Sequence, residues 1–351
     1  MNIDYIIIGQ GLAGSAVAIQ LLKRKRTFVV FDDPSANNSS RIAAGLFNPI
    51  TGKKMVRTWL AGMLFPYLTE FYRHVERETH SEFFHPLPMY RPFVSVEEQN
   101  EWMAKSSEQA FESFIKTVYT GKTVSGTRDE LGGLLLQHTG FVNTSEYIKA
   151  CRILIDRSAS LLTETFMSEK LEVEGSSVRY GDLQARRIIF CNGIHQNKWF
   201  SWLPIRPLKG ETITIQAEVQ QGMIMNRGVY MVPIGQGSWR VGSTYNFQDQ
   251  TATTTADGKK ELEENVRALI SSDFTITDHA FGFRPTTPDR RPILGPHPET
   301  DRVVIFNGLG TKGISLAPYF SEVLVRWLEN EGSINKEVDI ERFKSVYWAS
   351  P

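Results

Sequence analysis

The sequence is poor in the features that mark several special classes of protein. Among its 351 residues are only two cysteines, Cys151 and Cys191, which are too far apart for a CxxC redox pair and do not support a disulfide framework. Lys+Arg and Asp+Glu both number 39, so the formal net charge is zero and no basic surplus favours nucleic acid or an anionic membrane. No apolar run reaches the roughly 18 residues of a membrane span, and the first residues do not resemble a signal peptide. We therefore expect a cytoplasmic protein that does not bind a membrane, and the composition does not favour a nucleic-acid partner.

Two common kinds of catalytic motif are also missing. The seven histidines, among them His74, His80 and His85, do not pair with cysteines or carboxylates at metal-ligand spacing, so we predict no metal site. No Gly-x-Ser-x-Gly motif is present to suggest a serine hydrolase. With 41% hydrophobic and 22% charged residues, the chain has the composition of an ordinary globular protein and enough length for two lobes.

The N-terminus carries the pattern of a dinucleotide-binding turn. An apolar strand, Tyr5–Ile8, runs straight into Gly9, Gly11 and Gly14. Gly9 permits the tight turn, Gly11 lets a pyrophosphate approach the backbone, and Gly14 lets the following helix pack close to the strand. The phosphates would lie at the N–H groups and positive end of the helix that starts near Leu12.

A second strand and an acid complete this pattern. The strand Phe28–Phe31 ends at Asp32, roughly 20 residues past the glycines, where a carboxylate can accept both ribose hydroxyls of an adenosine. A glycine triplet by itself also fits a simple strand-to-helix turn. The strand before it, the helix after it and the acid at this distance favour the nucleotide site.

Farther along, the patterns indicate two kinds of sheet. The residues Arg187–Gly193, with the apolar run Ile188–Cys191, indicate a fully buried strand ending at a glycine, which is typical of a parallel sheet. The segments Glu211–Ala217, Gly228–Ile234 and Ser238–Ser243 alternate like antiparallel strands. From Trp59 to about Phe114 the pattern is helical, with prolines interrupting it. We predict an α/β fold in which an antiparallel lobe is inserted into a parallel one.

A second glycine loop, Gly308–Gly313, also has dinucleotide spacing. It lies between a strand, Arg302–Phe306, and an amphipathic helix, Ser315–Asn330. A second nucleotide site would need another strand with an acid about 20 residues on, but the polar segment Glu329–Lys336 follows instead. We therefore interpret the loop as backbone donors that face the other end of the one bound cofactor.

Several segments occur in the order found in one family. The chain resembles the FAD-dependent amine and amino-acid oxidases, which include D-amino-acid oxidase, glycine oxidase and monomeric sarcosine oxidase. Besides the N-terminal motif, the similar segments are Ser39-Ser40, Ala44-Gly45-Leu46, Leu203–Gly210, Val229–Pro233, Val241–Thr244, Gly282–Asp289, Pro292–Gly295 and Gly308–Pro318. The resemblance implies noncovalently bound FAD, whose reactive ring lies between two lobes and takes a hydride from a substrate amine.

The resemblance also implies a domain division and a set of cofactor contacts. We expect a discontinuous, Rossmann-like FAD-binding domain at 1–75, 141–203 and 282–351. An antiparallel-sheet α+β substrate domain would comprise 76–140 and 204–281. The expected FAD-binding residues are Gly9, Gly11, Leu12, Ala13, Gly14, Asp32, Asp33, Ser39, Ser40, Ala44, Gly45, Leu46, Gly193, Gly308, Gly310, Thr311, Lys312, Gly313 and Ile314.

Three side chains are the candidates for work on the substrate. Arg284 resembles the family's arginine that binds the substrate carboxylate, which a guanidinium grips bidentately; the alternative is a structural arginine that pairs with Asp289 or caps carbonyls. Tyr230 would donate to the same carboxylate, or pack as an ordinary strand aromatic. Lys312 and the amides of Gly310–Ile314 would stabilise negative charge on the reduced ring, although Lys312 could equally be a solvated loop lysine.

The substrate itself is left open between classes. The loop Gly308–Gly313 lacks the arginine that the glycine-oxidase form carries at Thr311. It looks more like the FAD domain of the bifunctional enzyme that modifies wobble uridine in transfer RNA, with Lys312 in place of that domain's arginine. A small amine or amino acid, oxidised with release of hydrogen peroxide, is our main prediction. The alternatives are oxidative demodification of an aminomethyl group on transfer RNA and a flavin-binding protein without turnover.

Overall fold

A computed structural model describes residues 1–33, 39–51, 56–195 and 197–349. Its first sheet consists of β1 (Asn2–Ile8), β2 (Phe28–Phe31), β11 (Ser160–Leu162), β12 (Glu172–Glu174), β13 (Ser177–Tyr180), β14 (Leu183–Phe190), β20 (Ile293–His297) and β21 (Thr300–Asn307). The strand order is β11-β2-β1-β14-β13-β12. Outside this order, β21 pairs with β14 and β20 pairs with β21. The pairs β11·β2, β2·β1, β1·β14 and β14·β21 are parallel.

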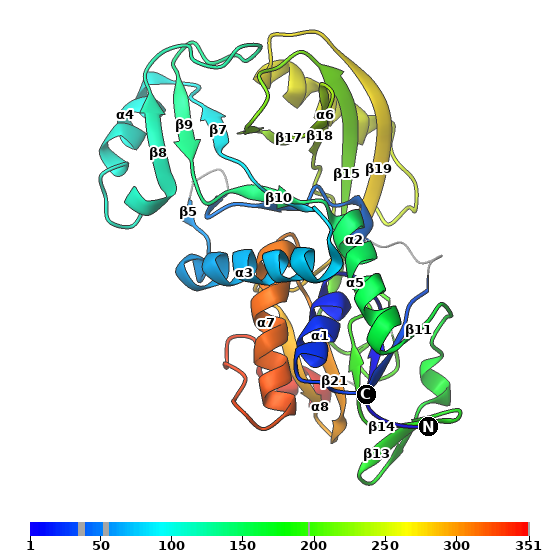
Figure 1. Ribbon diagram of the computed structural model, residues 1–351. Coiled ribbons are helices and arrows are strands. Elements are labelled where there is room, and N and C mark those ends of the chain that lie inside the picture. Colours follow the sequence, from blue (N-terminus) through cyan, green and yellow to red (C-terminus); the bar gives the residue numbers. More distant parts are fainter. Residues whose placement is uncertain (34–38, 52–55, 196, 350–351) are drawn as a thin grey trace.

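Helices cover one face of this sheet (Figure 1). They are α1 (Leu12–Lys23), α3 (Ala61–Thr79), α5 (Thr144–Ser158) and α7 (Gly313–Leu328), and they pack on one another. Strand β1 is apolar on both faces because both are covered. Tyr5 and Ile7 join the core with the helices, whereas Ile6 and Ile8 join a second core cluster with Phe190 on the other face.

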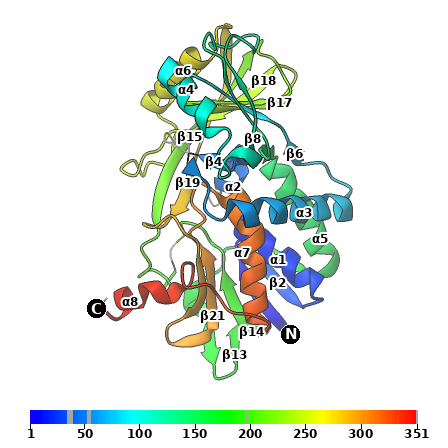
Figure 2. The ribbon, with the colours of Figure 1, turned by 90° about the vertical axis from the view of Figure 1, so that its left-hand side faces the viewer.

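The second sheet is predominantly antiparallel and has the order β19-β15-β18-β17-β16-β7-β9-β8. Its strands are β7 (Met89–Pro92), β8 (Ile115–Tyr119), β9 (Gly133–Leu136), β15 (Arg206–Ala217), β16 (Ile224–Arg227), β17 (Val229–Gly235), β18 (Ser238–Gly242) and β19 (Phe274–Thr286). Helix α6 (Ala256–Leu269) packs on one face, where Leu262 and Val266 meet the fully buried Trp239. The other face is turned toward the first sheet and its helices (Figure 2).

Short elements lie where the two parts meet. They are α2 (Ser39–Ile42), β3 (Leu46–Phe47), β4 (Ile50–Thr51), β5 (Val56–Arg57), β6 (Phe84–Pro86) and β10 (Gly140–Val142). The strands β3, β10 and β6 form a small sheet of their own, and α2 contacts β19. Helix α4 (Val96–Lys105) lies beside β8, and α8 (Lys344–Ala349) is the last described helix. Three single 3₁₀ turns lie at Glu112–Phe114, Ser168–Lys170 and Ile340–Phe343.

The predicted fold class, a Rossmann-like α/β part with an inserted antiparallel part, is confirmed. The helical pattern expected from Trp59 to Phe114 holds only for α3 and α4. Between them β6 and β7 are strands, because their prolines lack an N–H and do not fit a helix interior. The residue boundaries of the two domains stay a prediction. Within the described ranges, no helix combines the length and apolarity that crossing a membrane requires.

Candidate active site

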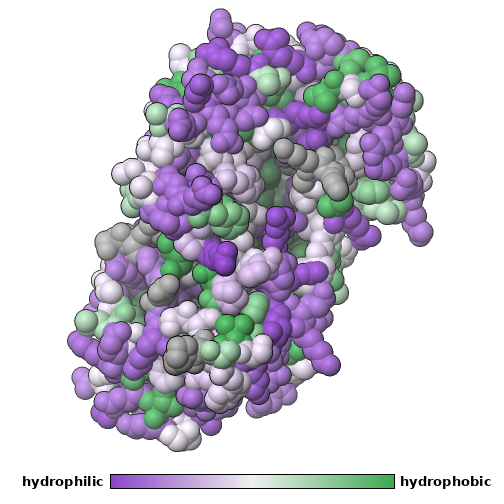
Figure 3. Space-filling model, turned by 180° about the vertical axis from the view of Figure 1, so that it is seen from behind, coloured by the Kyte–Doolittle hydropathy of each residue, from purple (hydrophilic) through white to green (hydrophobic). Residues whose placement is uncertain are grey.

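A cavity of about 1600 Å³ lies between the two parts of the molecule. It is lined by both glycine loops from the first part and by β15, β17, β18 and β19 from the second. Seen from behind, the surface is hollowed between the upper and lower parts, with apolar residues deep in the hollow (Figure 3). Pockets for small ligands are about 300–1,000 Å³. This cavity therefore has room for a dinucleotide and a further small molecule.

The N-terminal glycines have the shape that the sequence predicted. Gly9 has φ +96°, and a Cβ on it would lie 2.8 Å from the carbonyl oxygen of Cys191. A Cβ on Gly14 would lie 1.8 Å from the carbonyl oxygen of Gly9, so only glycine lets α1 pack this close to the turn. Gly11 is the N-cap of α1 and has no side chain to cap it. The first amides of the helix therefore face the cavity.

The two aspartates after β2 lie at the same end of the cavity. Asp32 is 6% exposed, and its Oδ1 accepts a 3.0 Å hydrogen bond from the backbone N–H of Gln10. Its Oδ2 lies 3.3 Å from the guanidinium of Arg41. Asp33 accepts a 2.6 Å hydrogen bond from Thr165. The hydrogen bond from Gln10 ties Asp32 directly to the glycine turn.

The segment after α2 forms another wall. The hydroxyl of Ser40 accepts a 3.2 Å hydrogen bond from the N–H of Leu12, and Ser39 lines the cavity beside it. Gly45 has φ +70°, and a Cβ on it would lie 1.8 Å from the carbonyl oxygen of Val142. The neighbouring Ala44 and Leu46 also line the cavity. The small residues are therefore needed for close packing between this segment and β10.

The two glycine loops meet at one place. A Cβ on Gly313, at the start of α7, would lie 2.8 Å from Cδ1 of Leu12. The side chain of Asn307, at the end of β21, donates a 2.7 Å hydrogen bond to the carbonyl of Gly193, in the segment after β14. All of the predicted cofactor residues line the cavity except Gly14 and Gly308, which pack against the atoms behind it.

Lys312 points into the cavity wall rather than into solvent. Its ammonium donates to the hydroxyls of Thr51, at 3.2 Å, and Thr58, at 3.3 Å. Burial lowers the pKa of Lys312, and the nearby charge of Arg290 lowers it further. Among the described residues the Lys312 ammonium has no carboxylate partner. The two threonines were not singled out from the sequence, because nothing in their spacing links them to a loop 250 residues away.

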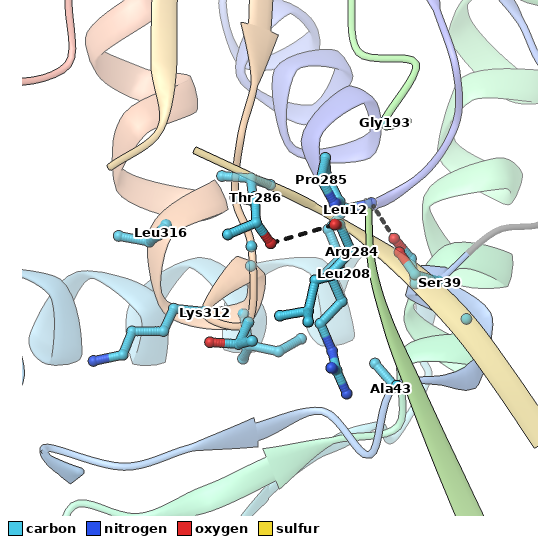
Figure 4. A pocket seen from close by; sticks show the side chains of 18 of the residues that line it. Leu12, Ser39, Ala43, Gly193, Leu208, Arg284, Pro285, Thr286, Lys312 and Leu316 are labelled. Atoms are coloured by element: carbon cyan, nitrogen blue, oxygen red, sulfur yellow. Dashed lines mark hydrogen bonds between the residues drawn. The ribbon is translucent and has the colours of Figure 1, made fainter. Parts of the chain in front are cut away.

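Arg284 is held at the cavity wall by the residues that follow β18. Its Nη2 donates a 2.7 Å hydrogen bond to Oγ of Ser243, and its Nη1 lies 3.4 Å from the carbonyl oxygen of Thr244. The ring of Tyr245 stacks on the guanidinium at 5.2 Å. Beneath it is Gly210, where a Cβ would lie 2.2 Å from Nη2. Figure 4 shows the Arg284 side chain passing Leu208 toward the segment that holds Ala43, apart from Lys312.

The alternative partner expected for Arg284 is engaged elsewhere. Asp289 accepts a 2.9 Å hydrogen bond from Nε of Arg342. The carbonyl contact at Thr244 does match the structural alternative. The other two partners of Arg284, Ser243 and Tyr245, carry no negative charge. The positive charge of the Arg284 guanidinium is therefore available at the cavity wall.

Tyr230 lies on the same wall. Its phenol lies over Gly242, where a Cβ would be 2.6 Å from the hydroxyl oxygen. Burial raises the pKa of Tyr230 to about 12, although Arg284 and a hydrogen bond with Ser243 act to lower it. Its hydroxyl therefore keeps its proton, and can donate it in a hydrogen bond, throughout the neutral range. Ser243 contacts both Arg284 and Tyr230 and so joins the two substrate-side candidates.

Other sequence expectations can be placed as well. Cys151 and Cys191 are free and buried, and burial raises the pKa of the Cys151 thiol to about 12. No set of three or more histidine, cysteine, aspartate or glutamate side chains able to hold a metal occurs in the described ranges.

Comparison with known proteins places the chain in a family. A family model described as FAD dependent oxidoreductase (DAO) matches residues 4–327. The chain is 24% identical to the tRNA 5-methylaminomethyl-2-thiouridine biosynthesis bifunctional protein MnmC of Marinobacter nauticus, covering 91% of this chain and 54% of that protein. It is 23% identical to the glycine oxidase of Bacillus subtilis, covering 96% of this chain and 94% of the relative. It therefore spans about half the length of its bifunctional relatives and nearly all of the glycine oxidase.

Solved structures agree on the fold. An iminodiacetate oxidase from Chelativorans sp. superposes with a TM-score of 0.79 at 20% identity, covering 97% of this chain and 98% of the other. A glycine oxidase from Geobacillus kaustophilus gives 0.77 at 18% identity, covering 95% and 96%. The N-terminal glycine turn, its linked acid and the shared cavity fit FAD, the cofactor of the matched family. The chain thus belongs to the DAO family of FAD-dependent oxidoreductases.

Proposed function

We propose that the protein oxidises the C–N bond of a small amine or amino acid, with oxygen as the final acceptor and hydrogen peroxide as a product. The observation that carries the proposal is the uncompensated charge of Arg284, held beside the phenol of Tyr230 on a cavity wall. A carboxylate is the group that such a pair recognises, because a guanidinium binds it bidentately and a phenol adds a third donor.

The proposed cofactor site uses the residues that both loops bring to the cavity. The amides at the start of α1 would receive the pyrophosphate, and Asp32 would accept the ribose hydroxyls. The residues from Gly310 to Ile314 would face the opposite end of FAD. When bound, FAD would supply the hydride acceptor for oxidation of the substrate C–N bond.

The protein's own task is then mainly orientation. Arg284 and Tyr230 fix the carboxylate, which also fixes the rotation of the substrate and the direction of its C–H bond. Lys312 and the N-terminus of α7 would supply positive charge at the far end of the cavity. This role agrees with the burial of Lys312 against two neutral hydroxyls, where its charge is not cancelled.

One alternative is action on transfer RNA, which the likeness to the MnmC relative supports. The formal net charge of zero argues against it, because phosphate contacts need a surplus of Lys and Arg. A flavin-binding protein without turnover is the other alternative, and only a reaction with a substrate distinguishes it from an enzyme.

The decisive experiment is an amine and amino-acid panel scored by anaerobic bleaching of the flavin. Bleaching by a small amine supports the proposal without assuming an acceptor, and peroxide release in air then tests oxygen. If no compound bleaches the flavin but transfer RNA binds with a steep salt dependence, the second function replaces the first. A yellow protein that shows neither response would be a flavin-binding protein only.

A further inference from the structure

The cavity has a second polar wall, formed by residues that the proposed reaction does not use. In the register of the second sheet, Thr212 pairs with Gly242, Gly242 with Tyr230, and Tyr230 with Asn226. Strand β16 lies parallel to β7, with Ile224 beside Met89 and Met225 beside Tyr90, and continuing this register by one residue brings Asn226 next to Arg91. Asn226 and Arg91 both line the cavity. Adjacent strands are about 4.8 Å apart, so Arg91 lies roughly 10 Å beyond Tyr230 along one row.

Arg91 has a positive charge that its neighbours do not fully balance. Both carboxylate oxygens of Glu98 accept hydrogen bonds from Nη1 of Arg227, at 2.7 and 2.8 Å. Arg91 is left with a contact of 3.7 Å to the same carboxylate. Two guanidiniums thus share one carboxylate, while Glu261 is an exposed residue at the cavity rim. The cluster of Arg91, Arg227 and Glu98 has a net charge of about +1.

The donor groups of Arg91 are also incompletely used. Its side chain is 12% exposed, and its buried Nε has no hydrogen-bond partner among the described residues. Burial and the neighbouring Arg227 lower the pKa of Arg91, whereas Glu98 acts to raise it. Nε itself is closed to solvent, so an anion in the cavity would meet the terminal Nη groups of Arg91, which shares its one carboxylate with Arg227.

We infer that the substrate carries two acidic groups, one bound by Arg284 and Tyr230 and the other by Arg91. The substrate would then be an acidic amino acid or an N-carboxyalkyl amino acid. It would lie between the two arginines, along the row of paired residues that leads from Tyr230 to Arg91. This inference rests on the proposed function, and it adds to that function a specificity-determining residue on a different strand.

The test measures binding rather than turnover. Unbranched monocarboxylates and dicarboxylates of equal chain length are titrated into the FAD-loaded protein, and the change in flavin absorbance reports binding. The best dicarboxylate should bind on the order of tenfold more tightly than its monocarboxylate counterpart, as expected for a charge-assisted hydrogen bond. In Arg91→Met this ratio should fall to about one. Arg179→Met, which removes an exposed arginine on β13, is the matched control and should keep the ratio.

Two further variants guard against a folding defect. Arg91→Lys keeps the charge but loses Nε, so the ratio should fall only in part. Glu98→Gln removes the one carboxylate of the cluster, so the ratio should rise above that of the wild type. A loss of selectivity in both Arg91→Met and Glu98→Gln would point to a disturbed fold and would overturn the inference.

The inference and the proposed function fail in different ways. If amino acids bleach the flavin but dicarboxylates bind no better than monocarboxylates, or Arg91→Met keeps their advantage, the second acidic group is wrong and the oxidation stands. If dicarboxylates bind selectively through Arg91 but no amine or amino acid bleaches the flavin, the anion site stands and the proposed oxidation is wrong. If neither response is seen, both are overturned.

Discussion

Arg284 donates a 2.7 Å hydrogen bond through Nη2 to the hydroxyl of Ser243. Ser243 follows the last residue of β18, whereas Arg284 lies near the end of β19, and β15 separates these two strands in the sheet. The same hydroxyl interacts with Tyr230. One serine therefore sets the position of both residues that we propose bind the substrate carboxylate.

Replacing Arg284 with alanine should remove substrate binding but not the cofactor. We expect kcat/KM to fall by about 2–4 kcal/mol of transition-state stabilisation, because a charged hydrogen-bond partner of the substrate is lost. Arg284→Lys should recover only part, since an ammonium cannot bind a carboxylate bidentately. Steady-state kinetics together with the bound FAD content would check this. Unchanged efficiency in the alanine variant would refute the role.

Gly210→Ala should displace Arg284 without changing any charge. The added Cβ would lie 2.2–2.4 Å from three atoms of the guanidinium, so the side chain must move. We expect a raised KM with FAD retained. The matched control is Gly121→Ala, because a Cβ there has no atom within 4 Å. Equal kinetics in both variants would show that the exact position of Arg284 is unimportant.

Gly14→Ala should destabilise the protein and weaken FAD binding together. The new Cβ would be 1.8 Å from the carbonyl oxygen of Gly9, and both groups belong to rigid backbone. Overpacking of this kind costs about 1–3 kcal/mol or more. Thermal unfolding with and without added FAD measures both effects, and the same Gly121→Ala variant gives the baseline. A normal melting temperature would contradict the close packing of α1 on the turn.

Asp32→Ala should weaken the adenosine end of the cofactor site. It removes the proposed ribose acceptor and also the hydrogen bond from Gln10 that fixes the turn. Each such bond to a charged group contributes about 1.5–3 kcal/mol. We therefore expect FAD to dissociate more easily, as measured by fluorescence of the released flavin. Asp156→Ala on the exposed side of α5 should retain FAD like the wild type.

Lys312 should make stability depend on alkaline pH. Its folded pKa is below the ordinary 10.5 because of burial, so between these two values the unfolded chain binds more protons than the folded one. The free energy of unfolding contributed by this group therefore rises with pH through that window. Lys312→Met should lack this rise. Denaturant unfolding of both proteins at several pH values up to 10.5 would reveal the difference, and parallel curves would count against a buried, uncompensated ammonium.

The local nucleotide motif could be predicted from the sequence because its requirements are local. Gly9, Gly14 and Asp32 follow one another within a single βαβ unit, where strand, turn and helix fix their relative positions. The fold class followed for a related reason, since apolar runs and alternating patterns distinguish strands covered on both faces from those covered on one. The helical prediction was wrong between α3 and α4, where prolines break the helical pattern and β6 and β7 are strands.

The candidate site depended on the tertiary structure wherever its partners are distant in sequence. Nothing along the chain links Lys312 to Thr51 and Thr58, or Glu98 to Arg227. Sequence composition and order determined the FAD-binding family and the two glycine loops. The register of the second sheet decided which polar side chains share the cavity wall, because a shift of one residue on any strand would turn them to the opposite face.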